Sequence, residues 1–377
     1  MTKVPYSYLD DQFADIDGYF EEIKKVVQSG DFTLGKAVAA FEEEFAKLTG
    51  LPYAVGVGSG TDALILPLKA IGIGPGDEVI TAANTFVATV GAIAMCGATP
   101  VFVDNNEQYT IDVSQIERAI TPKTKAIMPV HLSGCPANMP EVMKIAEKHN
   151  LKVIEDAAQA ILASIDGQHV GSWGEAAGFS LHPLKNLNVW GDGGIIVTKS
   201  KEMRDHLRLL RNHGMKTRDE IAIFGHNSRL DSIHAAIGLK LIKDVHWITD
   251  KRIENANKLD QAFQELNEFI QVPERPKGYN WVYHTYVLRV KNRDELLAYL
   301  LKEGIRAKVH YPIPMHLQEA SGYLGYKEGD FPVAEEDART MITLPVHQHL
   351  SAEQVDYMIE KVRGFYLKKQ NEITANV

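Results

Sequence analysis

Residues 178–194 read Gly-Phe-Ser-Leu-His-Pro-Leu-Lys-Asn-Leu-Asn-Val-Trp-Gly-Asp-Gly-Gly, an apolar strand followed by a lysine and then a glycine-rich turn. Lysine is rarely buried without a partner, so a buried lysine usually serves chemistry. A desolvated lysine amine with a lowered pKa is a nucleophile that can form a Schiff base. An isolated lysine at a strand end is more often a surface residue. The residues around Lys185 must therefore decide between the two interpretations.

Length and composition indicate an ordinary globular protein. The chain has 377 residues, enough for two or three domains, with 45% hydrophobic and 24% charged residues. The net charge of −9 and the lack of a Lys/Arg cluster argue against a nucleic-acid partner. The two cysteines, Cys96 and Cys135, have no second ligand at metal-binding spacing. We therefore expect neither a metal site nor an iron–sulfur cluster.

One stretch requires a membrane check, because residues 79–103 contain no charged side chain. Asn84, several threonines, two glycines and Pro100 interrupt it, so it does not resemble a spanning helix. A buried strand, helix and strand explain it better. The first residues also lack the apolar core of a signal peptide, and we expect a cytoplasmic protein without membrane contact.

Short apolar runs alternate with helix-period patterns along the first two thirds of the chain, which is typical of an α/β domain. The expected strands are 54–57, 78–81, 99–103, 124–129, 152–155, 176–180 and 194–198. One long charged helix is expected over 230–266, followed by strands at 281–290 and 306–310 and helices at 293–303 and 352–365. This pattern predicts a large domain, residues 1–245, with a mostly parallel central sheet flanked by helices. A smaller α+β domain, residues 246–377, follows it.

Four segments near predicted strand ends carry side chains suited to a phosphorylated aldehyde. Ser59-Gly60-Thr61 precedes a helix, whose free amides bind phosphate, although such a sequence is often only a helix cap. Asp156 ends a buried strand, where a carboxylate can keep a pyridine nitrogen protonated or simply cap the next helix. Phe86 follows another strand and could stack on a flat ring or belong to the core.

The fourth segment is the polar loop at residues 225–231, which includes Asn227 and Arg229. By itself it is a capping segment, but its donors would also suit an anion, even across a subunit boundary. Each segment alone has an ordinary structural explanation. Together with Lys185, in this order along the chain, the segments indicate a site for pyridoxal 5′-phosphate.

The residues that carry these features resemble the sugar aminotransferases of the DegT/DnrJ/EryC1/StrS family. The most specific match is the Lys185 segment at 180–187 with Gly191-Asp192-Gly193-Gly194, and the similarity extends over nearly the whole chain. The resemblance implies the fold of aspartate aminotransferase, called fold-type I. It also implies a homodimer with active sites at the subunit interface.

The resemblance also implies a role for individual residues. Lys185 would bind the aldehyde of the cofactor and move the proton. The implied cofactor contacts are Gly60, Thr61, Phe86, Asp156, Gln159, Ser180 and, from the second subunit, Asn227. The implied contacts to a sugar nucleotide are Arg229, His310 and Tyr311.

The implied reaction is ping-pong amino transfer, most simply from L-glutamate to a keto-sugar, giving an amino-sugar. The sequence around Lys185 is more similar to that of family members that aminate C-3 of a dTDP- or UDP-linked hexose than to that of members that aminate C-4. Leu181 and residues 188–190 depart from the usual pattern and lie where they could alter substrate choice. Two alternatives stay open: a sugar dehydratase, in which relatives carry histidine instead of the lysine, and a non-catalytic regulatory protein of the same fold.

Overall fold

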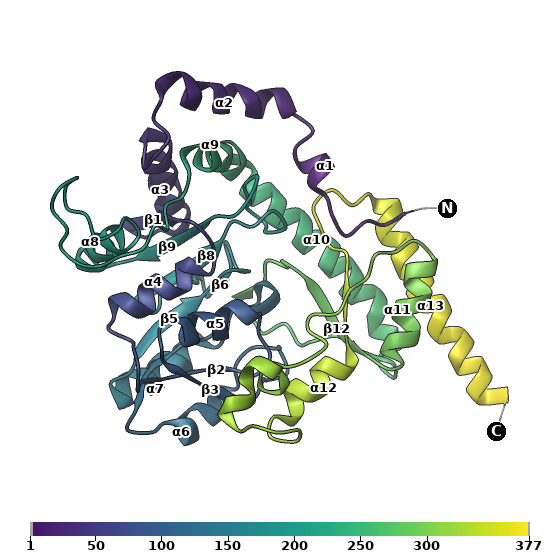
Figure 1. The fold of residues 1–377 in the computed structure, drawn as a ribbon. Helices are drawn as coiled ribbons and strands as arrows, with labels where there is room; N and C mark the ends of the chain where they lie inside the picture. Colours follow the sequence, from purple (N-terminus) through teal and green to yellow (C-terminus); the bar gives the residue numbers. More distant parts are fainter. Residues whose placement is uncertain (1–2, 376–377) are drawn as a thin grey trace.

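A seven-stranded sheet forms the centre of the structure, a computed structural model that describes residues 3–375 (Figure 1). The strand order is β1-β9-β8-β5-β4-β2-β3. β9 is antiparallel to its neighbours β1 and β8, and all other pairs are parallel. The prediction of a mostly parallel sheet is confirmed, and each of the seven strands predicted for it has both ends within two residues of an observed strand. The strands are β1 (Tyr53–Val57), β2 (Glu78–Ala82), β3 (Thr99–Val103), β4 (Thr124–Ile127), β5 (Lys152–Asp156), β8 (Ala176–Ser180) and β9 (Gly194–Thr198).

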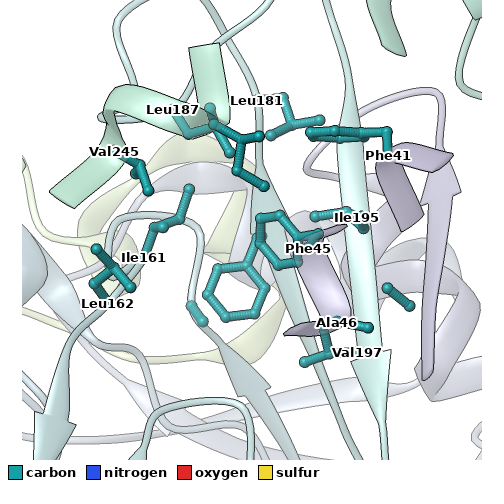
Figure 2. Close-up of a cluster of buried hydrophobic side chains, with 14 of the residues drawn as sticks. Phe41, Phe45, Ala46, Ile161, Leu162, Leu181, Leu187, Ile195, Val197 and Val245 are labelled. Atoms are coloured by element: carbon teal, nitrogen blue, oxygen red, sulfur yellow. The ribbon is translucent and has the colours of Figure 1, made fainter. Parts of the chain in front are cut away.

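Helices cover both faces of this sheet, which explains why its strands are continuous apolar runs. Successive side chains of a strand point to opposite faces. Ile195 and Val197 of β9 therefore join one core cluster, while Ile196 joins another. The first cluster includes Phe41 and Phe45, as Figure 2 shows. The helices around the sheet are α3 (Lys36–Thr49), α4 (Asp62–Ala70), α5 (Val87–Met95), α6 (Ile116–Ala119), α7 (Met139–His149), α8 (Lys201–Leu210) and α9 (Ser232–Leu241).

The single helix predicted over 230–266 is wrong, because the segment forms two α-helices. α9 ends at Leu241, a 3₁₀ turn covers Ile242–Asp244, and α10 runs over Val245–Phe263. The two helices pack against different parts of the chain. α9 lies against α2 (Ile16–Ser29) and α3, whereas α10 contacts α13. The tighter turn interrupts the α-helical hydrogen bonds where the packing partners change.

The C-terminal third forms a second, antiparallel sheet in the order β10-β12-β13. Its strands are β10 (Ile270–Gln271), β12 (Tyr286–Val290) and β13 (Met341–Leu344), and its helices are α11 (Arg293–Lys302), α12 (Pro332–Thr340) and α13 (Ala352–Ala375). The strand predicted at 281–290 begins only at Tyr286, because Tyr283 has a φ of +45°, outside the extended region. The strand predicted at 306–310 is a single bridge between Lys308 and Thr343.

Two smaller parts complete the fold. Strands β6 (Ser164–Ile165), β7 (Gln168–His169) and β11 (Tyr279–Asn280) form a short third sheet. The N-terminal arm, which we define as residues 4–29, contains α1 (Leu9–Gln12) and α2. It begins beside the C-terminal third, where Val4 pairs with Ile305, and ends with α2 on α9 (Figure 1). Within residues 3–375, no helix combines the length and apolar character needed to cross a membrane.

Candidate active site

A cavity of about 360 Å³ lies where the carboxyl ends of parallel strands of the large sheet meet. This is the edge at which α/β sheets generally bind ligands. Loops from the C-terminal third and a residue of the N-terminal arm close its other side. The predicted site residues that line it are Gly60, Thr61, Phe86, Asp156, Gln159, Ser180, Lys185, His310 and Tyr311.

Lys185 carries the only side chain amine with a strongly lowered pKa among the described residues. It lies five residues beyond the end of β8, in a turn closed by a hydrogen bond from its own amide to the His182 carbonyl (2.8 Å). Burial lowers the pKa of Lys185 to about 8, and the nearby carboxylate of Asp156 partly opposes that shift. A sizeable fraction of the amine is therefore neutral, and nucleophilic, near neutral pH.

Asp156 is the last residue of β5 and its side chain is buried. The hydroxyl of Thr89 donates to its Oδ2 at 2.6 Å, and the amide of Ala158 donates to its Oδ1 at 3.1 Å. Burial raises the pKa of this carboxyl above its ordinary value, and the two donors offset only part of that rise. The result is a buried carboxylate held in one orientation and facing the pocket that contains Lys185.

A small-residue turn between β1 and α4 forms another wall of the cavity. Gly60 lies so close to Ser180 that a Cβ at position 60 would be 2.6 Å from the Cβ of Ser180. Glycine is therefore required there for steric reasons. The turn leads directly into α4, and the first helix amides, of Asp62 and Ala63, already donate to Ser59. The amides of Gly60 and Thr61, just ahead of the helix, donate to no other group among the described residues. Together with the hydroxyls of Thr61 and Ser180, these amides are suited to a phosphate group.

Aromatic and histidine side chains close the opposite wall. The rings of Phe86 and Tyr311 have centroids 5.9 Å apart, and burial raises the pKa of Tyr311 to about 12. His310 hydrogen-bonds through Nδ1 to the hydroxyl of Thr343 at 2.9 Å. Burial, with Lys308 and Lys185 nearby, lowers the pKa of His310 to about 4. Near neutral pH both side chains are therefore uncharged groups that can donate a hydrogen bond.

Two predicted residues do not line the cavity of their own chain. Asn227 is exposed and forms a single backbone bridge with Asn212, and Arg229 donates to the side-chain oxygen of Asn212 at 3.0 Å. Both lie on the loop that follows α8. In a single chain, this loop leaves them outside the pocket.

The sequence interpretation also missed several residues of the cavity. His182 and Asp192 flank Lys185, so their nearness in sequence could have identified them. Tyr6, His284 and Lys308 come from distant segments, and no local pattern marks them. Their contribution depends on how the arm and the C-terminal third pack against the large sheet.

The fold and the position of the cavity place the protein among the fold-type I aminotransferases. A solved structure of DesV from S. venezuelae, in complex with a ketimine intermediate, superposes with a TM-score of 0.94. It is 38% identical in sequence, and the match covers 97% of this chain and 99% of that one. Identity at this level and this coverage reflect common ancestry as well as a shared fold.

Sequence comparison gives the particular family. The chain matches the pattern of the DegT/DnrJ/EryC1/StrS aminotransferase family over residues 15–363, and it belongs to that family. It is 42% identical to the pleiotropic regulatory protein of Geobacillus stearothermophilus, over 93% of this chain and 97% of that protein. It is also 42% identical to the UDP-N-acetyl-3-dehydro-alpha-D-glucosamine 3-aminotransferase of Acidithiobacillus ferrooxidans, over 96% and 98%.

Proposed function

We propose that the protein is a pyridoxal phosphate-dependent aminotransferase that moves an amino group from L-glutamate to a nucleotide-linked 3-keto sugar. The observation that carries this proposal is the Lys185 amine, with a pKa lowered to about 8, in one cavity with the buried carboxylate of Asp156. Solved structures of relatives hold pyridoxal phosphate or its amino form, which supports the choice of cofactor.

The residues of the cavity fit this cofactor. Lys185 would bind its aldehyde, and Asp156 would face its pyridine nitrogen, with Gln159 near the ring and Phe86 over one face. The steric requirement for glycine at position 60 leaves a cradle for the phosphate, formed with Thr61 and Ser180. When bound, the cofactor supplies an electron sink that stabilises negative charge on the carbon next to the transferred nitrogen.

The protein's own groups perform the proton transfers. A Lys185 amine with a pKa of about 8 exists in both protonation states near neutral pH, so it can accept a proton and return it. Asp156 must stay ionised to hold a pyridine nitrogen protonated, and the donors Thr89 and Ala158 favour that charged form.

The substrate side of the proposal rests on sequence and on the relatives. The relative from Acidithiobacillus acts, by its name, on a UDP-linked sugar with a 3-keto group, which supports C-3 rather than C-4 amination. We propose that His310 and Tyr311, both on the cavity wall, contact the sugar. Whether the nucleotide is UDP or dTDP would be set by residues outside the cofactor pocket.

We further propose a homodimer in which each subunit completes the site of the other. Asn227 and Arg229 lie outside their own cavity, on a loop whose Phe224 is fully exposed. A second subunit that covered this loop would bury Phe224 and bring both polar side chains to the partner's cavity. A cytoplasmic location and a domain boundary at residue 245 stay predictions from the sequence.

A subunit-mixing experiment tests this sharing. Lys185→Ala and Asn227→Ala dimers would each be impaired, whereas a hybrid dimer would contain one site with neither substitution. Mixing the two unfolded variants and refolding them together should restore about a quarter of the wild-type activity if the other site in the hybrid is silent, because half of the dimers are hybrids. Activity no greater than the mean of the two variants would contradict the shared site.

The half-reaction with L-glutamate tests the proposed activity directly. The cofactor-loaded protein should lose its visible absorbance when glutamate is added and release an equivalent of 2-oxoglutarate, and Lys185→Ala should do neither. The name of the Geobacillus relative favours a regulatory role as the second candidate. A protein that binds the cofactor but leaves glutamate unchanged, alone and with keto-sugars, would support that role. A sugar product that has lost water without gaining nitrogen would indicate a dehydratase.

A further inference from the structure

We propose that Tyr8 of the N-terminal arm is a positioning residue that holds Lys185 in place for reaction with the cofactor. The proposal rests on the assignment of Lys185 as the cofactor-binding lysine. Tyr8 lies 177 residues away in sequence and its side chain is not part of the cavity wall. Its effect would be exerted through the backbone of the loop that carries Lys185.

The hydroxyl of Tyr8 lies directly against that loop. It is 2.9 Å from the carbonyl oxygen of Lys185 and 3.1 Å from that of Leu184, so its proton is shared between the two acceptors. The side-chain amide of Asn188 donates to the same Lys185 carbonyl at 2.8 Å. The carbonyl of the reactive lysine is therefore held from two directions, by the arm and by the loop itself.

Tyr8 is itself fixed by its surroundings. Its ring stacks on His347 at a centroid distance of 5.2 Å and lies 5.0 Å from the guanidinium carbon of the buried Arg252. Arg252 is anchored by donating to the carbonyls of Tyr283 and His284. Burial raises the pKa of Tyr8, so the phenol keeps its proton and remains a donor at any working pH.

The arm contacts the other end of the lysine loop as well. Trp190 lies among three aromatic rings of the arm, with centroid distances of 5.7 Å to Phe13, 5.6 Å to Tyr19 and 5.7 Å to Phe20. Asn188 and Trp190 belong to residues 188–190, the segment whose sequence departs from the usual pattern of the family. Trp190 packs this loop against the arm, whereas Asn188 holds the loop from within, through the Lys185 carbonyl.

The chemistry explains why such anchoring matters. The amine of Lys185 sits at the end of a long flexible side chain, so its reach depends on where the backbone holds the Cα. Rates of oriented reactions fall steeply when reacting groups are displaced by about 1 Å. A supporting layer that fixes the backbone therefore raises the rate at which the amine meets the aldehyde.

Tyr8→Phe tests the proposal, because it removes the hydroxyl and keeps the ring. The rate at which pyridoxal 5′-phosphate attaches to the apo-protein, followed by absorbance, should fall roughly three- to tenfold, as expected for one lost buried hydrogen bond. Cofactor affinity should weaken by a similar factor. The matched control is Tyr366→Phe, since Tyr366 also donates to a carbonyl, that of Lys291, at 2.7 Å but is remote from the cavity.

The two substitutions separate positioning from stability. Tyr366→Phe should lower the melting temperature without changing the attachment rate. If Tyr8→Phe slows attachment no more than Tyr366→Phe does, the positioning role is refuted. Wild-type apo-protein that fails to take up the cofactor at all would instead contradict the proposed cofactor, and so distinguishes the two failures.

Asn188→Ala provides a second route that leaves the arm intact. Tyr8 and Asn188 donate to the same carbonyl. Removing the Asn188 donor should therefore change the attachment rate by a different factor in Tyr8→Phe than in the wild-type protein. The attachment rates of the two single variants and the double variant should therefore be non-additive. If Tyr8→Phe does not fold, Asn188→Ala alone decides: slowed attachment supports the anchoring of the carbonyl, and an unchanged rate overturns it.

Discussion

The amine of Lys185 should attack an aldehyde at pH values where an ordinary lysine is almost wholly protonated. Burial lowers its pKa from 10.5 to about 8, and only the neutral amine has a free electron pair. At pH 7, a pKa of 8 leaves about one amine in eleven neutral, whereas a pKa of 10.5 leaves about one in three thousand. Attachment of the cofactor at pH 7 should therefore be about 300-fold faster than the ordinary pKa would allow.

Stopped-flow absorbance measures this prediction when apo-protein is mixed with pyridoxal 5′-phosphate across a range of about pH 6 to 10. The rate should rise with pH and level off above a midpoint near 8, while the same reaction with free Nα-acetyl-lysine, whose side-chain amine has an ordinary pKa, keeps rising. Asp156→Asn should move the midpoint down, because the Asp156 carboxylate raises the pKa of Lys185. A rate that climbs to about pH 10 without levelling would show that the Lys185 pKa is not lowered. A midpoint that moves up in Asp156→Asn would show that the Asp156 carboxylate does not raise it.

Three further substitutions test other parts of the structure. Gly60→Ala should weaken cofactor binding roughly tenfold, measured by titration of apo-protein, because the new Cβ would lie 2.6 Å from the Cβ of Ser180 at the end of β8. Thr89→Val removes a donor to Asp156, so the carboxyl pKa should rise further, and single-turnover rates with glutamate should fall roughly three- to tenfold. Glu42→Ala should lower the free energy of unfolding by about 3–5 kcal/mol in urea denaturation, because it leaves the buried Arg211 without its carboxylate partner.

Each of these has a control or a contradicting outcome. Gly364→Ala adds a methyl group to α13, where nothing lies within 4 Å of the new Cβ, so it should leave cofactor binding unchanged and stability equal or higher. Wild-type affinity in Gly60→Ala would show that the turn can open. An unchanged single-turnover rate in Thr89→Val would show that the Thr89 hydroxyl is not needed to keep Asp156 ionised. A loss below about 1 kcal/mol in Glu42→Ala would place the ion pair among weak surface pairs.

The large sheet could be predicted from the sequence because its information is local. Strands buried on both faces must be short apolar runs, and turns rich in glycine or proline bound them, as at residues 74–76 before β2. The predictions that were wrong concern element boundaries that are set by tertiary contacts. The break between α9 and α10 follows from a change of packing partners, and the positive φ of Tyr283 shortens the strand before Tyr286.

The residues of the candidate site also fall into two groups: those that local sequence could predict and those that depend on long-range packing. Residues at consecutive strand ends, such as Gly60, Asp156 and Lys185, could be grouped because parallel strands bring their carboxyl ends to one edge. Tyr6 and Tyr8 could not be found, since the arm reaches the lysine loop across more than 170 residues of sequence. The sequence pattern identifies the side chains at the ends of strands. Which distant segments pack against those side chains is determined by tertiary structure.

Transfer of labelled nitrogen from glutamate to a sugar would show the proposed reaction itself. The protein, loaded with pyridoxal phosphate, would be incubated with nitrogen-15-labelled L-glutamate and a panel of UDP- and dTDP-linked 3-keto and 4-keto hexoses, and the sugars analysed by mass spectrometry. We expect a 3-keto sugar to be returned as an amino-sugar that carries the label, and Lys185→Ala to return every sugar unchanged. Unlabelled sugars from the wild-type protein, or labelled sugar from Lys185→Ala, would contradict the claim that Lys185 serves a sugar aminotransferase.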